Sequence, residues 1–461
     1  MVLKRIQLIT LSRKIGSIFL VTSFLIHLAT VSEAQVANGK DTSQFFTLKQ
    51  CIDYALLHQP ALNQSQINVS IAKITNAINL SGWYPQVNVT GNLTHYIELP
   101  TTYVANTANP GGPPLKEQTG VVNTVIPEFL ASQALFSPSL LYASKSAPLY
   151  VKQAVQITDS TKINIVSSVS KSFYNLLLTL EQIDVLKADT QLFAQTLRDA
   201  YHQYIGGIVD ETDYEQATIT LNNSKAQLKQ ALENVTPQYA TLKQLMGYAP
   251  ENQFNVSFDT LEMMRDIAFD TTQPLQFDKR IEIQQLQTAK SLQHLVTAYY
   301  QHAYLPTVSA FFEYNYEFES NSYSNLYSNA FPNSLVGLSF NIPVFTGFAR
   351  LKNVDRSKLQ ERLIDWSEVD LRSQIYLEYT TALANYRGNL YNFQALQENV
   401  AMAKRVYFVV SLQYKQGLVP YLNVVTAQSN LISSEISYVN ALFQVLSSKI
   451  DLEKALGIIT Y

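Results

Sequence analysis

The sequence predicts a mainly α-helical protein with a transmembrane β part, built from one structural unit that is used twice. Two observations lead to this prediction. Residues 203–247 and 413–457 align without a gap, share twelve identical positions, and both place apolar or small residues at steps of three and four. Four shorter segments between the helical stretches alternate apolar and polar residues, which is the period of a strand with two unlike faces.

The two matching segments predict long antiparallel coiled-coil helices. An average step of 3.5 residues keeps one stripe of a helix facing a partner helix along its length. The stripe in residues 413–457 consists of Val424, Ala427, Leu431, Ser434, Tyr438, Ala441, Val445, Ser448, Leu452 and Ala455. The equivalent stripe consists of Tyr214, Ala217, Leu221, Ser224, Leu228, Ala231, Val235, Gln238, Leu242 and Leu245. An ordinary amphipathic helix is the alternative, but repetition in register favours the coiled coil.

Composition excludes several classes of protein. The chain has 461 residues, of which 47% are apolar, so it is not a disordered chain. It has only 15 glycines, which suits long helices with few tight turns. Its net charge of −3 shows no basic excess, so nucleic acid is not an expected partner. The single cysteine, Cys51, excludes an intramolecular disulfide, and we expect it to be a buried thiol.

The N-terminus has the pattern of a secretory signal. Basic residues come first, an apolar stretch occupies 15–31, and Ser32-Glu33-Ala34 forms a small-x-small cleavage site. We therefore predict a signal peptide over residues 1–34. A membrane anchor helix is the alternative for this stretch.

Residues 35–247 are predicted to form the first structural repeat. After a short leader, the expected elements are a helix at 47–81, a strand at 86–99, a loop at 100–119, a strand at 121–136, a long helix from 138 to about 205, and the repeat helix to 247. Pro60 should kink or break the first helix near its start. The long helix would extend for ~100 Å at 1.5 Å per residue, so it must lie along other long helices.

Residues 274–461 are predicted to form the second repeat, after a linker at 248–273. The same order is expected: a helix at 274–304, a strand around 312–318, a polar loop, a strand at 335–345, a long helix to 414, and the repeat helix to 457. The long helix of each repeat carries an apolar stripe at equivalent positions. In the first repeat the stripe is Val166, Val169, Phe173, Leu176, Leu180, Ile183, Lys187, Thr190, Ala194, Leu197, Tyr201 and Tyr204.

Four strands cannot close a β-barrel, because closed barrels need about eight or more. An open sheet cannot stand in lipid, where every backbone polar group must be paired. We therefore expect several chains to contribute four strands each to a shared barrel. A small soluble sheet that caps a coiled coil is the alternative.

No catalytic constellation stands out in the sequence. It lacks a G-x-S-x-G elbow, a phosphate-binding glycine loop, an HExxH pair and paired cysteines. Its mature histidines are scattered, and acid pairs such as Glu181 and Asp184 suit a solvated helix face. The sequence therefore predicts no enzyme, no cofactor and no metal site.

At consistent offsets, the motifs resemble those of the TolC-like outer-membrane efflux proteins, over about residues 47–459. The resemblance is carried by the repeat, the W-Y-P and Y-L-P junctions at 83–85 and 304–306, the L-F and V-F turns at 135–136 and 344–345, and the Y-x-x-G segments that end in M-G and L-G. The family is the outer-membrane factor of tripartite export systems.

The resemblance implies a homotrimer with a twelve-stranded barrel in outer-membrane lipid and a twelve-helix tunnel in the periplasm. Such a trimer is a passive exit duct that docks to a periplasmic adaptor protein and an inner-membrane pump. Drug or metal efflux and type I secretion all remain open, as do pump classes such as RND, ABC and MFS. A periplasmic or surface coiled-coil protein without a pore is the alternative function.

The resemblance also implies where the tunnel ends and narrows. The adaptor-contacting helix tips would be Tyr204, Gly207, Ile208, Val209, Tyr414, Gly417, Leu418 and Val419. Family members often carry aspartates six and nine residues after the second tip glycine, where this chain has Asn423 and Thr426. The first tip offers Asp213, so Asp213, Asn423 and Thr426 form the predicted pore gate. The alternative for Asp213 is a solvated first-turn residue favoured by the helix dipole.

Overall fold

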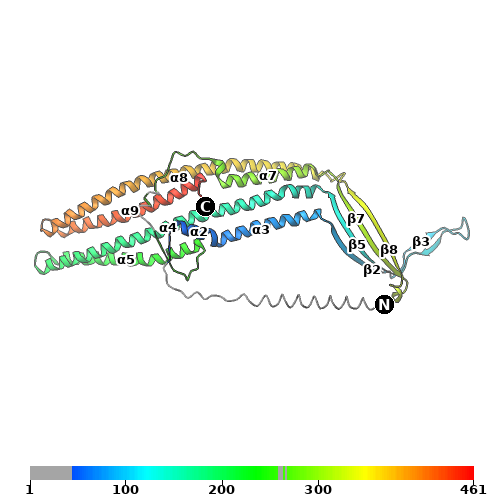
Figure 1. The fold of residues 1–461 in the computed structure, drawn as a ribbon, viewed down its shortest axis with the longest axis horizontal. Coiled ribbons are helices and arrows are strands. Elements are labelled where there is room, and N and C mark those ends of the chain that lie inside the picture. Colours follow the sequence, from blue (N-terminus) through cyan, green and yellow to red (C-terminus); the bar gives the residue numbers. More distant parts are fainter. Residues whose placement is uncertain (1–43, 258–262, 265–266) are drawn as a thin grey trace, which may run out of the picture. The chain divides into compact units, whose positions relative to one another are not determined.

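The computed structural model describes residues 44–257, 263–264 and 267–461 (Figure 1). The predicted signal peptide at 1–34 lies outside the described residues, as does part of the linker predicted at 248–273. The description below concerns the compact unit Phe45–Tyr461.

The first predicted helix is two helices, α2 (Leu48–His58) and α3 (Pro60–Leu80). Thr47 caps α2 through a capping box with Gln50, which satisfies two backbone donors at the helix start. Gln59 is extended, because a residue before proline is disfavoured in the helical region. The break expected at Pro60 is confirmed.

One antiparallel sheet contains four strands in the order β2 (Gln86–His95), β5 (Asn123–Phe136), β7 (Thr307–Ser320) and β8 (Ala330–Asn341). Pro127 lies inside β5, opposite Gly91 of β2. On the other side of β5, the pairing with β7 is interrupted at residues 126–127 and resumes in the same register. Proline has no N–H to donate, so the ladder loses pairs there without a shift.

Three sequence predictions about this region are wrong. The expected loop at 100–119 contains a second hairpin, β3 (Thr101–Val104) paired with β4 (Leu115–Gln118). The strand expected at 86–99 ends at His95, and the strand expected at 335–345 starts at Ala330 and ends at Asn341. Cross-strand pairing with β7 holds Ala330 to Ser334 in the sheet although their side chains look loop-like. Local composition cannot detect such pairing.

Two long helical hairpins make up most of the molecule. The first pairs α4 (Pro138–Ile205) with α5 (Glu211–Met246), and the second pairs α8 (Ala349–Lys415) with α9 (Tyr421–Leu456) (Figure 1). Near the sheet, α3 packs on α4, and α7 (Ile281–Gln301) packs on both α4 and α8. The layer order α3-α4-α7-α8 therefore follows the strand order of the sheet. The helix expected from residue 274 begins later, after a 3₁₀ turn at Phe277–Lys279.

The predicted coiled-coil stripes are largely buried. In α9 all ten positions are buried or half-buried, and the same is true of the ten positions in α5. In α4 the predicted stripe holds as far as Ile183, and beyond it the most buried side chains lie one residue before the predicted positions. The buried positions become Leu186, Asp189, Phe193 and Ala200, while Lys187 and Tyr201 are exposed.

The main core lies where the hairpins meet α2 and the short ribbon formed by β1 (Gln44–Phe46) and β6 (Phe254–Val256). Tyr386 is fully buried there, and its hydroxyl donates to the Ile267 carbonyl at 2.6 Å. Cys51 is also fully buried, as predicted, and burial raises the pKa of its thiol to about 12. A buried thiol with a raised pKa stays protonated and unreactive, so Cys51 contributes to the core by packing.

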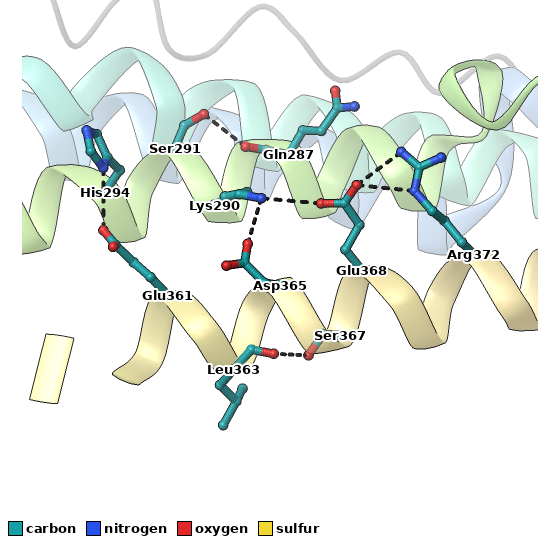
Figure 2. A network of polar contacts seen from close by, with 10 residues as sticks. All are labelled: Gln287, Lys290, Ser291, His294, Glu361, Leu363, Asp365, Ser367, Glu368 and Arg372. Atoms are coloured by element: carbon teal, nitrogen blue, oxygen red, sulfur yellow. Dashed lines mark hydrogen bonds and ion pairs between the residues drawn. The ribbon is translucent and has the colours of Figure 1, made fainter. Parts of the chain in front are cut away.

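An ion-pair network fixes the register of α7 against α8 (Figure 2). Lys290 Nζ lies 2.7 Å from Asp365 Oδ1 and 3.4 Å from Glu368 Oε2. Arg372 also binds Glu368, one turn further along α8. These side chains are largely solvent-exposed, so each pair contributes little stability but together they favour one register.

We predict that Gly247→Ala destabilises the protein more than Gly207→Ala. Both glycines have a left-handed backbone, with φ of +69° and +68°, so alanine costs ~1 kcal/mol or more at either site. At Gly247 the new Cβ would also lie 2.7 Å from the His58 carbonyl oxygen, whereas nothing lies within 4 Å at Gly207. The measurement is the melting temperature of the detergent-solubilised protein. An equal or larger drop for Gly207→Ala contradicts the packing described here.

Candidate functional site

The four-stranded sheet has one apolar face. The register places alternate residues of β2 and β5 and of β7 and β8 on the same side. The large residues of that side are Val87, Val89, Leu93, Val125, Phe129, Val308, Phe312, Tyr314, Tyr316, Phe318, Val336, Leu338 and Phe340. Many are strongly exposed, up to 80% at Val336. An apolar face of this kind needs an apolar surrounding, and lipid provides one.

The opposite face of the same sheet is polar and acidic. It carries Glu128, Glu313, Glu317 and Glu319 among Ser, Thr, Asn and Gln residues, together with a few apolar residues such as Leu130, Phe311 and Leu335. Within these four strands, all of them described, this face has no Lys, Arg or His. Alternation in the sequence predicted a polar face but not that all its charged residues are acidic. The glutamates among residues 313–319 could have indicated this.

The sheet has two edge strands, and each has no neighbouring strand on its outer side among the described residues. Strands β2 and β8 pair on one side only, so each leaves a row of backbone donors and acceptors free. Below them, α3 exposes Ile67, Ile71, Ile74 and Ile78 on the side away from α4. On α8, Leu359, Leu363, Trp366 and Leu377 are exposed on the side opposite the residues that bind α7, because 3.6 residues make one turn.

The distal ends of the two hairpins are built alike. Gly207 and Gly417 adopt left-handed conformations with φ of +68° and +73°. In each turn the following apolar residue donates its backbone N–H to a carbonyl of the preceding helix at 2.9 Å, Ile208 to Gln203 and Leu418 to Gln413. This geometry turns Ile208 and Leu418 outward, and they are 73% and 68% exposed. Val209 and Val419 are half-buried beside them.

A cavity of about 680 Å³ separates the two tips. It is lined by both turns and by Gln203, Asp213, Tyr414 and Tyr421. The Tyr414 hydroxyl bridges the hairpins by donating to Gln203 Oε1 at 2.5 Å. Burial, followed by the charges of Asp213 and Asp199, raises the pKa of Tyr414 to about 12, so this hydroxyl stays protonated.

The three predicted gate residues lie in different surroundings. Asp213 lines the cavity between the hairpins and is half-buried. Its desolvation, and then the charge of Asp210, raise the pKa of its carboxyl. Asn423 and Thr426 are exposed on α9. Of the predicted tip residues, Tyr204 is half-buried and stacks on Tyr214 with ring centroids 6.1 Å apart.

None of the described helices is long and apolar enough to cross a membrane. In the same residues, no group of three or more His, Cys, Asp and Glu is placed to hold a metal ion.

The family model of the outer membrane efflux proteins matches residues 51–248 and 284–458. The chain belongs to the outer membrane efflux protein family. It is thus an outer-membrane efflux channel protein with a periplasmic helical domain, in agreement with the sheet that has an apolar and a polar face. This membership favours the efflux channel over a coiled-coil structural protein without a pore. No curated protein sequence matches the chain.

Solved outer-membrane proteins share this fold. VceC of Vibrio cholerae is 15% identical with a TM-score of 0.69, over 89% of this chain and 96% of that chain. The CmeC outer membrane channel of Campylobacter jejuni is 18% identical with a TM-score of 0.69, over 89% of this chain and 85% of that chain. The MtrE outer membrane channel of Neisseria gonorrhoeae, in its open state, is 17% identical with a TM-score of 0.69, over 89% and 88%.

We predict that Tyr414→Phe loosens the tips of this efflux protein without affecting the rest of it. The change removes the hydroxyl that joins the hairpins and leaves the buried ring, so it costs about 1 kcal/mol locally. Amide hydrogen exchange should speed up in residues 200–215 and 412–425. Tyr391→Phe, at an exposed position of α8, is the matched control. Unchanged exchange in the Tyr414 variant would show that the bridge does not hold the tips together.

Proposed function

We propose that three copies of this chain form a passive exit duct through the outer membrane and periplasm. The observation that carries the proposal is the pair of free sheet edges on a sheet with an apolar face. In lipid these edges must be paired, and β8 of one copy can pair with β2 of the next until the sheet closes. Three copies give twelve strands, enough to enclose a water-filled lumen lined by the acidic face.

The helical edges support the same assembly. The isoleucine stripe of α3 and the Leu/Trp stripe of α8 lie on opposite edges of one layer. A ring of three chains would bury both stripes against each other and continue the barrel as a tunnel of twelve helices. The exposed apolar area of each chain would then be covered at the same interface that closes the sheet.

We further propose an organisation into two structural repeats at 35–247 and 274–461, joined by a linker at 248–273. The support is the element order helix, strand, strand, long helix, helix, which occurs twice, with α5 and α9 of equal length. No catalysis and no cofactor are part of the proposal.

The helix tips are the proposed docking site for a periplasmic adaptor, which would connect the duct to an inner-membrane pump. Their turns present Gly207, Ile208, Val209, Gly417, Leu418 and Val419, flanked by Tyr204 and Tyr414. Exposed apolar residues on tight turns can pack against the apolar face of a helical partner. The pump would supply the energy, because nothing in a passive duct can move cargo against a gradient.

We predict that Ile74→Glu prevents trimer formation. The glutamate would place a charge in the middle of the α3 stripe and in the proposed interface, where burial without a partner is costly. Asn68→Glu adds the same charge to a neighbouring exposed face of α3 and should leave the trimer intact. Native mass spectrometry of protein extracted from outer membranes would give the oligomeric state. A trimer of undiminished yield in the Ile74 variant would remove α3 from the interface.

We also propose that the duct narrows near Asp213, Asn423 and Thr426, where threefold symmetry makes each residue a ring of three. A ring of carboxylates in a narrow lumen attracts cations. Asp213→Asn should therefore reduce cation selectivity and block by multivalent cations, and Asn423→Asp should increase both. Single-channel recordings measure these properties, with Glu317→Gln on the wide sheet as the control. Unchanged selectivity and block in both variants would place the constriction elsewhere.

A further inference from the structure

Asp189 is a buried carboxyl at the seam between the two hairpins. It belongs to α4, where it lies one residue before a predicted stripe position, and only 5% of its surface is exposed. Its Oδ2 atom is fully enclosed and has no hydrogen-bond partner. A buried oxygen without a donor is costly, and it is far more costly when it is charged.

The groups that face Asp189 come from three helices. From α8, Lys404 binds Glu435 of α9 with a distance of 2.9 Å between Nζ and Oε1. Tyr407 of α8 also faces Asp189, and burial followed by the charge of Asp189 raises the pKa of its hydroxyl. From α5, the Ser224 hydroxyl bonds Thr190 next to Asp189 at 2.8 Å. Lys404, the cation that acts on Asp189, is therefore shared with a second carboxylate.

This environment favours the neutral form of the carboxyl. Burial, together with the like charge of Glu435, raises the pKa of Asp189 from 3.8 to about 7, against the smaller opposing effect of Lys404. A raised pKa means that the packed state binds the proton more tightly than the separated state. The stability of the seam is therefore complete below the ordinary pKa and is lost as the pH rises through the raised one.

Contacts on either side of Asp189 define which part of the seam can move. Towards the core, Lys171 pairs with Asp451, and Gln182 donates to Asn440 Oδ1 at 2.9 Å. Towards the tips, Tyr407 of α8 bonds the Thr196 side chain of α4, and the Tyr414 hydroxyl donates to Gln203. The seam between Gln182 and the tips thus has an ionisable residue near its middle and polar contacts at both ends.

We propose that Asp189 is a protonation-controlled latch that holds the two hairpins of one chain together. When Asp189 is neutral, the carboxyl packs between α8 and α9 and the tips stay joined. When it loses its proton, the carboxylate faces Glu435 across the seam, and the hairpins separate from Gln182 toward the tips. Since one proton is involved, the closed state loses about tenfold in relative population per pH unit between the two pKa values and levels off above them.

Hydrogen exchange on the assembled protein tests the latch without reference to transport. Comparison of each variant with the unmodified protein at the same pH removes the intrinsic pH dependence of exchange. Asp189→Asn keeps the shape and abolishes the charge, so residues 186–205 and 421–436 should be far better protected than in the unmodified protein at pH 8, and by a much smaller margin at pH 5. Asp184→Asn is the control, because Asp184 lies on the same helix but its side chain is 74% exposed. Equal protection of the Asp189 variant and the unmodified protein at both pH values would overturn the proposal.

A second variant tests the latch independently, in case Asp189→Asn alters the folding of the protein. Glu435→Gln removes the like charge and frees Lys404 to pair with Asp189, so the exchange transition should move to lower pH. A transition at unchanged pH in this variant would also overturn the latch.

The consequence for conductance rests on the proposed duct. If the duct exists, its conductance should rise with pH in the unmodified protein and stay at the low-pH level in Asp189→Asn. Absence of any channel in the unmodified protein would refute the duct while the exchange result still decides the latch. Equal pH profiles in a conducting pair would refute a role of the latch in gating.

Discussion

The need to pair every backbone group of the sheet is the constraint on which the rest of this structure depends. A four-stranded sheet with an apolar face has two free edges, and β2 and β8 carry them. In lipid an unpaired edge is not tolerated, and this is why we propose that copies of the chain complete one another's sheets. The helical layer repeats the strand order, so that α3 and α8 come to the same two edges as the free strands. The sheet and the helical layer therefore have their free edges on the same two sides of the chain.

Stability is distributed unevenly along the hairpins. The main core lies near the middle of the molecule, where residues of both halves pack around Leu176, Tyr386 and Leu446. Towards the tips, the second core is small, and the hairpins meet through single polar contacts such as Tyr414–Gln203. Few buried apolar contacts and many polar ones are the signature of a segment that opens before the rest of the protein.

The carboxylates of the sheet and those of the helices lie in different surroundings. The sheet keeps its carboxylates on one face without any basic residue, whereas the helices pair most of theirs along α7, α8 and α9. Unpaired carboxylates that face water in a lumen remain solvated and act at a distance through their field. The buried Asp189 is in the opposite situation, since its Oδ2 atom is enclosed without a donor and the like charge of Glu435 outweighs the effect of Lys404. The location of a carboxyl, rather than its presence, decides whether it attracts solutes or regulates packing.

Much of the fold could be predicted from the sequence, because its signals are local and periodic. Proline, glycine and heptad spacing correctly predicted the break at Pro60, the long helix Pro138–Ile205 and the helix ends at Gly247 and Gly457. Alternation indicated the segments that lie in β2, β5, β7 and β8 but missed β3 and β4, and the strand register then fixed which side chains share a face. The tertiary structure alone decided the features that depend on distant partners. These are the early start of β8, which follows from pairing with β7, and the burial of Asp189 and the position of Asp213, which follow from how neighbouring helices pack. A single stripe read from the sequence cannot show which of several packed helices each residue meets, since that is set by the crossing of the helices in space.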